Sequence, residues 1–192
     1  MKNAIILHGR PSKQQWEDPQ FPSTSNYYWI PWLQKQLALA GYDVQTPEVP
    51  NAYIPNYAVW RRTFEQYKVN EQSTLIGHSC GAGFLVRWLS ENVDAEIDKL
   101  LLVAPWVDEA GDPDNEYTKE FMNFEIDKTM KGRIKTIKII SSSNDMATIQ
   151  RSIKILESKI DGIQTIELVD RGHFYDDSAM TFPELLQEVL AA

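Results

Sequence analysis

The chain has 192 residues, of which 43% are hydrophobic and 24% are charged, as is usual for a globular protein with a buried core. Its length predicts one domain over residues 1–192. The net charge of −8 argues against binding to a nucleic acid or to an anionic membrane. One cysteine, Cys80, excludes an internal disulfide, and the N-terminal apolar run is too short for a signal peptide, so we expect a cytoplasmic protein.

Six short apolar runs recur along the chain and predict the strands of a sheet. They cover residues 4–7, 43–46, 74–76, 100–103, 137–140 and 165–169. Runs that are apolar on both sides are typical of parallel strands with helices on each face. None approaches the ~18 apolar residues that a membrane span requires.

Helical patterns lie between these runs. They cover residues 29–40, 56–67, 84–89, 148–159 and 183–190. Gly41 suits the end of the first helix, and Asn56 and Thr148 are candidate N-caps of the second and fourth. Pro183 suits the first turn of the last helix. The alternation predicts an α/β fold, a doubly wound and mostly parallel sheet of about six strands with helices on both faces.

Two segments between these elements, residues 10–26 and 105–132, are long for a compact domain. Each follows the carboxyl end of a predicted strand, where open α/β sheets bind ligands. Loops of this length are commonly binding loops or lids. Aromatic residues in and beside both segments are therefore candidates for a substrate pocket. They are Trp16, Tyr28, Trp29, Trp106 and Phe121.

The sequence Gly77-His78-Ser79-Cys80-Gly81 fits the G-x-S-x-G pattern of a nucleophile elbow. A predicted strand precedes it and a predicted helix follows it, which is the context that this motif requires. Ser79 is therefore the candidate nucleophile. The Cys80 side chain is expected to turn into the helix and to pack as a small buried hydrophobe.

A serine hydroxyl needs a base to take its proton and an acid to orient that base. His173 is the only histidine after Ser79 and follows the last predicted strand, so it is the candidate base. Asp145, directly after the fifth predicted strand, is the favoured acid. The alternatives that the sequence leaves open are Asp108, Asp170, Asp176 and Asp177.

The oxyanion formed in such a reaction needs two backbone N–H donors. We expect these to be the amides of Cys80, which follows the nucleophile, and of Arg10, in the loop after the first strand. His8 is expected to brace that loop rather than to transfer protons. The three histidines are scattered and no nucleotide-binding glycine motif is present, so no metal and no cofactor are expected.

These residues resemble the small serine hydrolases of the YdeN-like and retinoblastoma-binding-protein-like family, within the α/β-hydrolase superfamily. The resemblance runs from Ile5-Ile6-Leu7-His8-Gly9, through the elbow and Asn144-Asp145, to Gly172-His173-Phe174. It implies a triad of Ser79, Asp145 and His173 in a minimal α/β-hydrolase fold without a separate cap domain.

The sequence thus predicts an esterase-like serine hydrolase that cleaves a small ester, thioester or activated amide through an acyl-enzyme. Two alternatives remain open. One is a protein-interaction module that keeps the fold with vestigial activity, since fold does not determine function. The other is an acyltransferase that uses the same triad. The expected partner is a small acyl substrate, with a protein partner possible and either a monomer or a homodimer.

Overall fold

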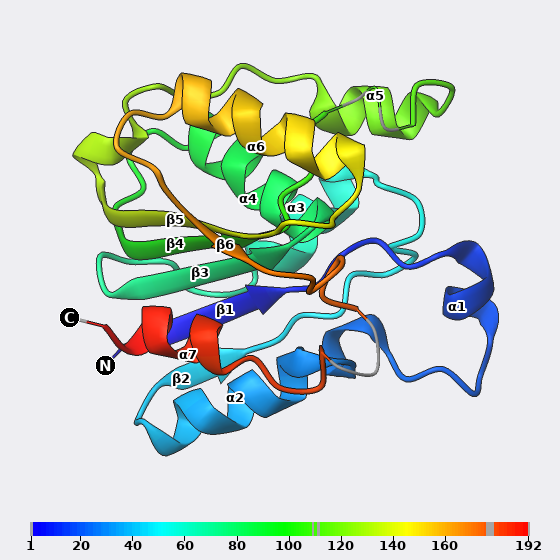
Figure 1. The fold of residues 1–192 in the computed structure, drawn as a ribbon, viewed down its shortest axis with the longest axis horizontal. Helices are drawn as coiled ribbons and strands as arrows, with labels where there is room; N and C mark the ends of the chain where they lie inside the picture. The colour runs from blue at the N-terminus through cyan, green and yellow to red at the C-terminus, as the bar shows by residue number, and fades with distance from the viewer. Residues whose placement is uncertain (1, 109, 111, 176–178, 192) are drawn as a thin grey trace.

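The computed structural model describes residues 2–108, 110, 112–175 and 179–191, in which six strands form one sheet (Figure 1). The strands are β1 (Asn3–Leu7), β2 (Asp43–Gln45), β3 (Ser73–His78), β4 (Ile97–Val103), β5 (Ile134–Ser142) and β6 (Gln164–Leu168). Their order is β2-β1-β3-β4-β5-β6, and every neighbouring pair is parallel. The predicted parallel sheet is confirmed.

Helices cover both faces of this sheet. They are α1 (Lys13–Glu17), α2 (Trp29–Leu39), α3 (Tyr57–Phe64), α4 (Cys80–Glu91), α5 (Glu116–Met122), α6 (Ala147–Lys159) and α7 (Pro183–Leu190). In Figure 1, α2 and α7 lie on one face, whereas α3, α4 and α6 lie on the other. No helix in the described part of the chain is long and apolar enough to cross a membrane.

Burial differs between the centre and the edges of the sheet. Every residue of β3 is buried, and β4 is buried apart from the half-buried Asp98, because helices cover both faces there. The two edge strands differ, since β2 and β6 contain no fully buried residue. Each edge strand pairs on one side only, so the expectation of strands buried on both faces holds for the centre alone.

The helix boundaries follow the predicted signals with two differences. Asn56 caps α3 and Gly41 has the left-handed φ of +84° expected after α2. However, α3 ends at Phe64 rather than near residue 67, and the N-cap of α6 is Met146 rather than Thr148. The turn after β5 therefore enters α6 sooner than the capping pattern predicted.

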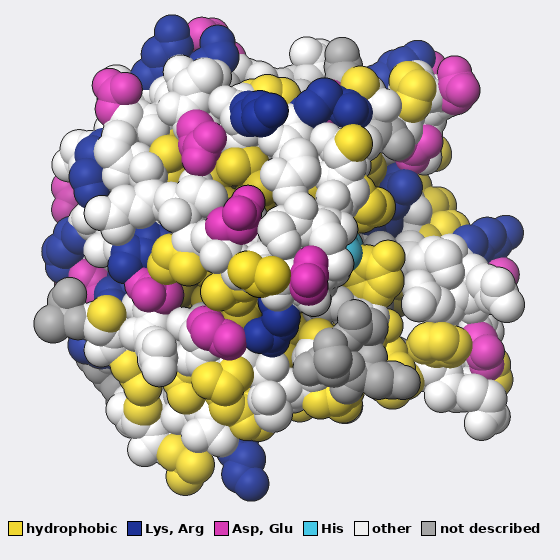
Figure 2. All heavy atoms as spheres, viewed as in Figure 1, with side chains coloured by type: hydrophobic (Ala, Val, Ile, Leu, Met, Phe, Trp, Pro, Cys, Tyr) yellow, Lys and Arg dark blue, Asp and Glu magenta, His cyan; other side chains and the backbone are white. Residues whose placement is uncertain are grey.

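The two long segments contain short helices of their own. Residues 10–26 carry α1, whose Ser12 and Gln15 form a capping box, and a 3-10 turn over residues 24–26. This segment projects beyond the carboxyl ends of the strands (Figure 1), and a hollow separates part of it from the body of the molecule (Figure 2). The segment over residues 105–132 carries α5 and a 3-10 turn at residues 130–132.

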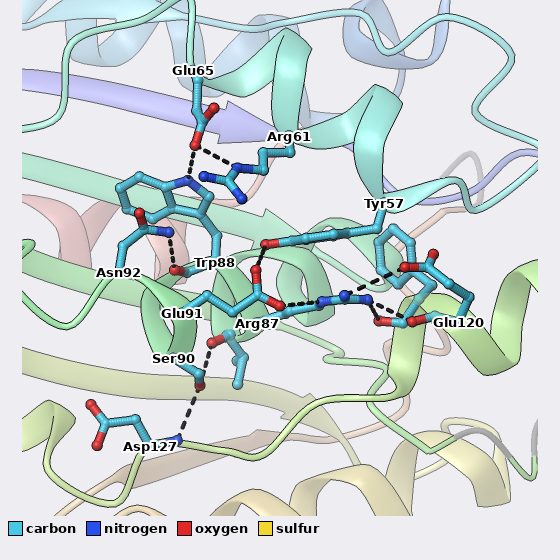
Figure 3. Close-up of polar contacts among 12 residues, drawn as sticks. Tyr57, Arg61, Glu65, Arg87, Trp88, Ser90, Glu91, Asn92, Glu120 and Asp127 are labelled. Carbon is cyan, nitrogen blue, oxygen red and sulfur yellow. Dashed lines mark hydrogen bonds and ion pairs between the residues drawn. The ribbon is translucent and has the colours of Figure 1, made fainter.

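Arg87 joins three of the helices on one face of the sheet (Figure 3). From α4, its Nε donates to Glu91 at 2.8 Å and its Nη1 donates to the Glu120 and Phe121 carbonyls of α5 at 2.6 and 3.0 Å. Its Cζ lies 3.6 Å from the ring centre of Tyr57 on α3. The second long segment is thereby tied to the core through α5.

Candidate active site

Ser79 lies in the sharp turn between β3 and α4. Its φ of 53° and ψ of −114° form a strained conformation for a residue with a side chain. The turn is held to the sheet, because the Ser79 amide donates to the Val103 carbonyl of β4 at 2.9 Å. A Cβ at Gly81 would lie 2.4 Å from the His8 carbonyl oxygen, so α4 approaches β1 as closely as it does only with glycine there.

The side chains of Ser79, His173 and Asp145 form a continuous chain of hydrogen bonds. Nδ1 of His173 lies 2.9 and 3.1 Å from the two carboxylate oxygens of Asp145, and its Nε2 lies 2.9 Å from Ser79 Oγ. An ionised carboxylate only accepts hydrogen bonds, so Nδ1 carries the proton and the unprotonated Nε2 accepts from the serine hydroxyl. The Asp145 side chain is fully buried and that of His173 is 9% exposed.

Other carboxylates considered as the acid have different partners. Asp108 accepts from Arg151 Nε at 2.6 Å and from the Ala110 amide at 3.0 Å. Asp170 contributes its amide to Ser143 Oγ at 3.1 Å, within the turn that precedes His173. Asp176 and Asp177 lie outside the described residues. Asp145 is the carboxylate that the described structure brings to His173.

A polar turn after β5 holds the loop that carries His173. Ser142 Oγ accepts from the Arg171 amide and Asn144 Oδ1 accepts from the Gly172 amide, both at 2.8 Å. Ser142 Oγ also donates to Asn144 Oδ1 at 2.8 Å. The turn therefore fixes the position of the histidine as well as that of the acid. Sequence reasoning considered only Asp145 in this run of polar residues.

His78, inside the elbow motif, also contacts the loop that carries His173. Its Nε2 donates to the His173 carbonyl at 2.8 Å, and the two rings are 5.0 Å apart. Burial, together with the nearby His173, lowers the pKa of His78 to about 3, so it is neutral. Sequence reasoning did not single out this residue, because the elbow motif accepts many side chains at its second position.

His8 and Cys80 are both buried next to the elbow. Nδ1 of His8 donates to the Gly9 carbonyl at 2.7 Å, and its Nε2 accepts from the Val49 amide at 3.0 Å. Both ring nitrogens are thus occupied in holding the loop after β1. Burial raises the pKa of Cys80 to about 12, so its thiol is protonated and inert at neutral pH.

The amides of Cys80 and Arg10 are the predicted oxyanion donors, and Arg10 lines the same cavity as Ser79. Cys80 is the first residue of α4, and its amide is one of the helix N–H groups that lack an intrahelical acceptor. Arg10 lies in the loop after β1 that His8 holds. Among the described residues, neither amide has a hydrogen-bond acceptor, so both are available to a ligand.

A cavity of about 910 Å³ adjoins Ser79 and His173 beneath the projecting residues 10–26. Of the predicted pocket residues, Trp16, Tyr28, Trp29 and Trp106 line it. Phe121 does not, and this prediction is wrong. Its side chain is fully buried against Tyr57, Trp60 and Phe84, because α5 turns its apolar side toward the core.

A model of the serine hydrolase family matches residues 19–191, which include the elbow, Asp145 and His173. The chain belongs to the serine hydrolase family. None of the curated proteins compared with this hydrolase matches it in sequence.

Solved structures share the fold over nearly the whole chain. The ydeN gene product of B. subtilis is 22% identical with a TM-score of 0.79, covering 98% of this chain and 97% of its own. Est1E from Butyrivibrio proteoclasticus is 13% identical, with a TM-score of 0.61 and coverage of 98% and 86%. A structure from a study of the metagenome-derived lipolytic enzymes LipS and LipT is 15% identical, with a TM-score of 0.64 and coverage of 98% and 91%. The hydrolase therefore has the minimal α/β-hydrolase fold.

The described residues contain no group of three or more His, Cys, Asp or Glu side chains that could hold a metal ion. The residues that line the cavity include Ser79, with its hydroxyl, and His173, with its imidazole, and among the described residues the amides of Arg10 and Cys80 have no hydrogen-bond acceptor. A hydroxyl within hydrogen-bond distance of an imidazole is the arrangement that activates a serine nucleophile.

Proposed function

We propose that this serine hydrolase cleaves a small ester, thioester or activated amide through an acyl-enzyme formed on Ser79. The observation that carries the proposal is the uninterrupted Ser79–His173–Asp145 chain, with distances of 2.9 Å at both links. Hydrogen-bond distances of this size are what a nucleophile, its base and the orienting acid need for acyl transfer.

In the first half of the reaction, Ser79 Oγ attacks the substrate carbonyl carbon as its proton passes to Nε2 of His173. The carbonyl oxygen becomes an oxyanion, which accepts hydrogen bonds from the amides of Cys80 and Arg10. Asp145 holds the imidazole in the correct tautomer and stabilises its positive charge. The C–O, C–S or C–N bond then breaks, and the leaving group takes the proton from His173.

In the second half, a water molecule takes the place of the leaving group. His173 removes its proton as the water oxygen attacks the acyl carbon, and the proton returns to Ser79 Oγ when the acyl–serine bond breaks. The products are a carboxylic acid and the free enzyme. No redox step and no added cofactor is needed for this balance.

The test is fluorophosphonate labelling read by intact mass, followed by turnover of short-chain esters. We expect one adduct on the wild type and none on Ser79→Ala. Ser79→Ala and His173→Ala should each lower kcat by several orders of magnitude, as removal of triad members does. Absence of an adduct on folded wild-type protein would contradict the proposal.

The choice of acid has its own matched pair of variants. Asp145→Asn should lower kcat by about 10⁴-fold, because the amide favours the wrong histidine tautomer. Asp108→Asn should leave kcat close to that of the wild type, since Asp108 pairs with Arg151. A larger loss in Asp108→Asn than in Asp145→Asn would show that the acid is wrongly assigned.

A further inference from the structure

A row of aromatic rings connects the projecting segment to the candidate base. Phe21 lies edge-on to Tyr27 at 6.1 Å between ring centres, and Tyr27 stacks on Tyr28 at 3.9 Å. Tyr28 lies 6.2 Å from Tyr175, which lies edge-on to His173 at 5.1 Å. All five residues line the cavity. The row ends at the imidazole that contacts Ser79.

Of the phenylalanine and tyrosine side chains in this row, Phe21 and Tyr175 are exposed, and Tyr27 and Tyr28 are half-buried. Phe21 is 40% exposed and Tyr175 is 48% exposed, so each presents much of an aromatic ring at the surface. Tyr28 also has a strained backbone, with φ of 52° and ψ of −132° at the N-cap of α2. Non-glycine residues in such conformations cluster at ligand clamps and active sites. The Tyr28 ring contacts both Tyr27 and Tyr175, at 3.9 and 6.2 Å between ring centres.

The charges around the cavity disfavour an anionic substrate. Arg10 supplies the cationic side chain among the described lining residues, and its Nη1 donates to Asp112 at 2.9 Å while its Cζ lies 4.9 Å from the Trp106 ring. Two carboxylates, Asp18 and Glu48, also line the cavity. A carboxylate on the substrate would meet these negative charges without an unpaired cation to offset them.

We propose that the cavity selects esters that carry an uncharged aromatic ring and that Tyr28 and Tyr175 bind this ring. The inference rests on the proposed function for its placement beside Ser79. The volume of about 910 Å³ exceeds what a short acyl group fills, so a ring fits on the acyl or the alcohol side of the ester. Aromatic pairs gain from edge-to-face and offset contacts beyond the apolar area that they bury, which a saturated ring of similar size does not.

The wild type is tested on two matched pairs of esters. The acyl-side pair is methyl 3-phenylpropanoate and methyl 3-cyclohexylpropanoate, and the alcohol-side pair is benzyl acetate and cyclohexylmethyl acetate. We expect kcat/KM to favour the aromatic member of at least one pair by roughly threefold to tenfold. The pair that shows this preference tells which side of the ester holds the ring. A carboxylate added to the aromatic ring of the preferred ester should lower its kcat/KM relative to the uncharged aromatic ester.

Single variants assign the preference to the two tyrosines. Tyr28→Leu and Tyr175→Leu should bring the ratio of kcat/KM for the aromatic ester to that for the saturated ester close to one. Tyr28→Phe and Tyr175→Phe should keep the wild-type ratio. Tyr117→Leu is the matched control, because this tyrosine is 51% exposed on α5 and does not line the cavity. It should keep the wild-type ratio. Retention of the full ratio in both leucine variants at positions 28 and 175 would overturn the inference.

A binding measurement separates this inference from the proposed function. Calorimetric titration of Ser79→Ala with each ester pair needs no turnover and should show tighter binding of an aromatic member. One outcome is that Ser79 is labelled by the fluorophosphonate but kcat/KM is equal within both ester pairs. That result would overturn the ring inference and leave the hydrolase proposal standing. Tighter aromatic binding without labelling or turnover would overturn the hydrolase proposal and support the ring site.

Discussion

Ser79 stores backbone strain at the point where the nucleophile is presented. A glycine accepts its φ of 53° and ψ of −114° without steric conflict. We therefore expect Ser79→Gly to raise the free energy of unfolding by about 1 kcal/mol, since such conformations cost 1–3 kcal/mol and part of the gain is lost to the flexibility of glycine. Urea unfolding measures this change. Ser79→Ala keeps the Cβ and the strain, so equal stability of the two variants would contradict the interpretation.

His78 holds the candidate base, His173, in position through a hydrogen bond to the backbone carbonyl of His173. His78→Leu removes the donor to the His173 carbonyl at 2.8 Å and should lower kcat by about tenfold or more, with little change in KM. His78→Gln keeps an N–H donor and should restore much of the rate. Steady-state kinetics on one ester separates kcat from KM. A loss confined to KM, or no rescue by glutamine, would show that the contact does not position His173.

The candidate site was only partly predictable from the sequence. Ser79 and His173 followed from a motif and from chain order, which are local signals. Asp145 was favoured from its place after the fifth predicted strand, but the alternatives stayed open, because sequence distance does not show which carboxylate faces Nδ1 of His173. Phe121 was misplaced for a related reason. The sequence shows that an aromatic residue lies in a long loop, but it does not show whether the side chain faces a cavity or the core.

At the level of the elements, Arg87 of α4 links this helix to α5 through hydrogen bonds and to α3 through the Tyr57 ring. Its side chain is 10% exposed and donates to Glu91 and to two carbonyls of α5. Arg87→Leu leaves the buried Phe121 carbonyl without this donor and removes the ion pair with the partly exposed Glu91, so we expect the free energy of unfolding to fall by about 2 kcal/mol. Chemical denaturation measures this loss.

A surface ion pair on α5 provides the control for Arg87. Lys119 pairs with Glu116 at 2.8 Å, with side chains 47% and 83% exposed. Lys119→Ala should change stability by no more than about 0.5 kcal/mol, because water screens exposed pairs. Similar losses in the Arg87 and Lys119 variants would show that burial adds nothing to the first network.

The order and type of the elements were largely predictable, since all six strands and the five predicted helices are present. Strong apolar periodicity specifies such elements, because each of them buries one or both sides. The short α1 lacked this signal and contains no buried residue, so its sequence alone did not distinguish it from a loop. The exposed outer side of β6 also escaped prediction, because strand order across the sheet depends on contacts between distant residues.

For the whole molecule, two buried histidines make stability depend on pH. Burial lowers the pKa of both His8 and His78, to about 3 for His78. Below the unfolded-state pKa of about 6.5, the unfolded chain binds protons that the folded chain does not, so stability is full above this pH and falls as the pH decreases. We expect a loss of about 2 kcal/mol from His78 between pH 7.5 and pH 5, and a further loss from His8.

Urea unfolding at several pH values between 7.5 and 5 measures this dependence. His78→Gln does not titrate in this range, so its stability should fall less steeply than that of the wild type. The difference between the two slopes isolates the contribution of one histidine. Identical slopes would mean that His78 binds its proton equally well in the folded and unfolded chains.

The wholly parallel sheet also determines how the chain must fold. Neighbouring parallel strands are joined by crossovers, so no pair can begin as a local hairpin. The first strand, β1, pairs Asn3 with Ser73 of β3, which requires the closure of a long segment. Until this segment has closed, strands that are apolar on both sides lack partners. We therefore expect slow refolding that competes with aggregation as the protein concentration rises.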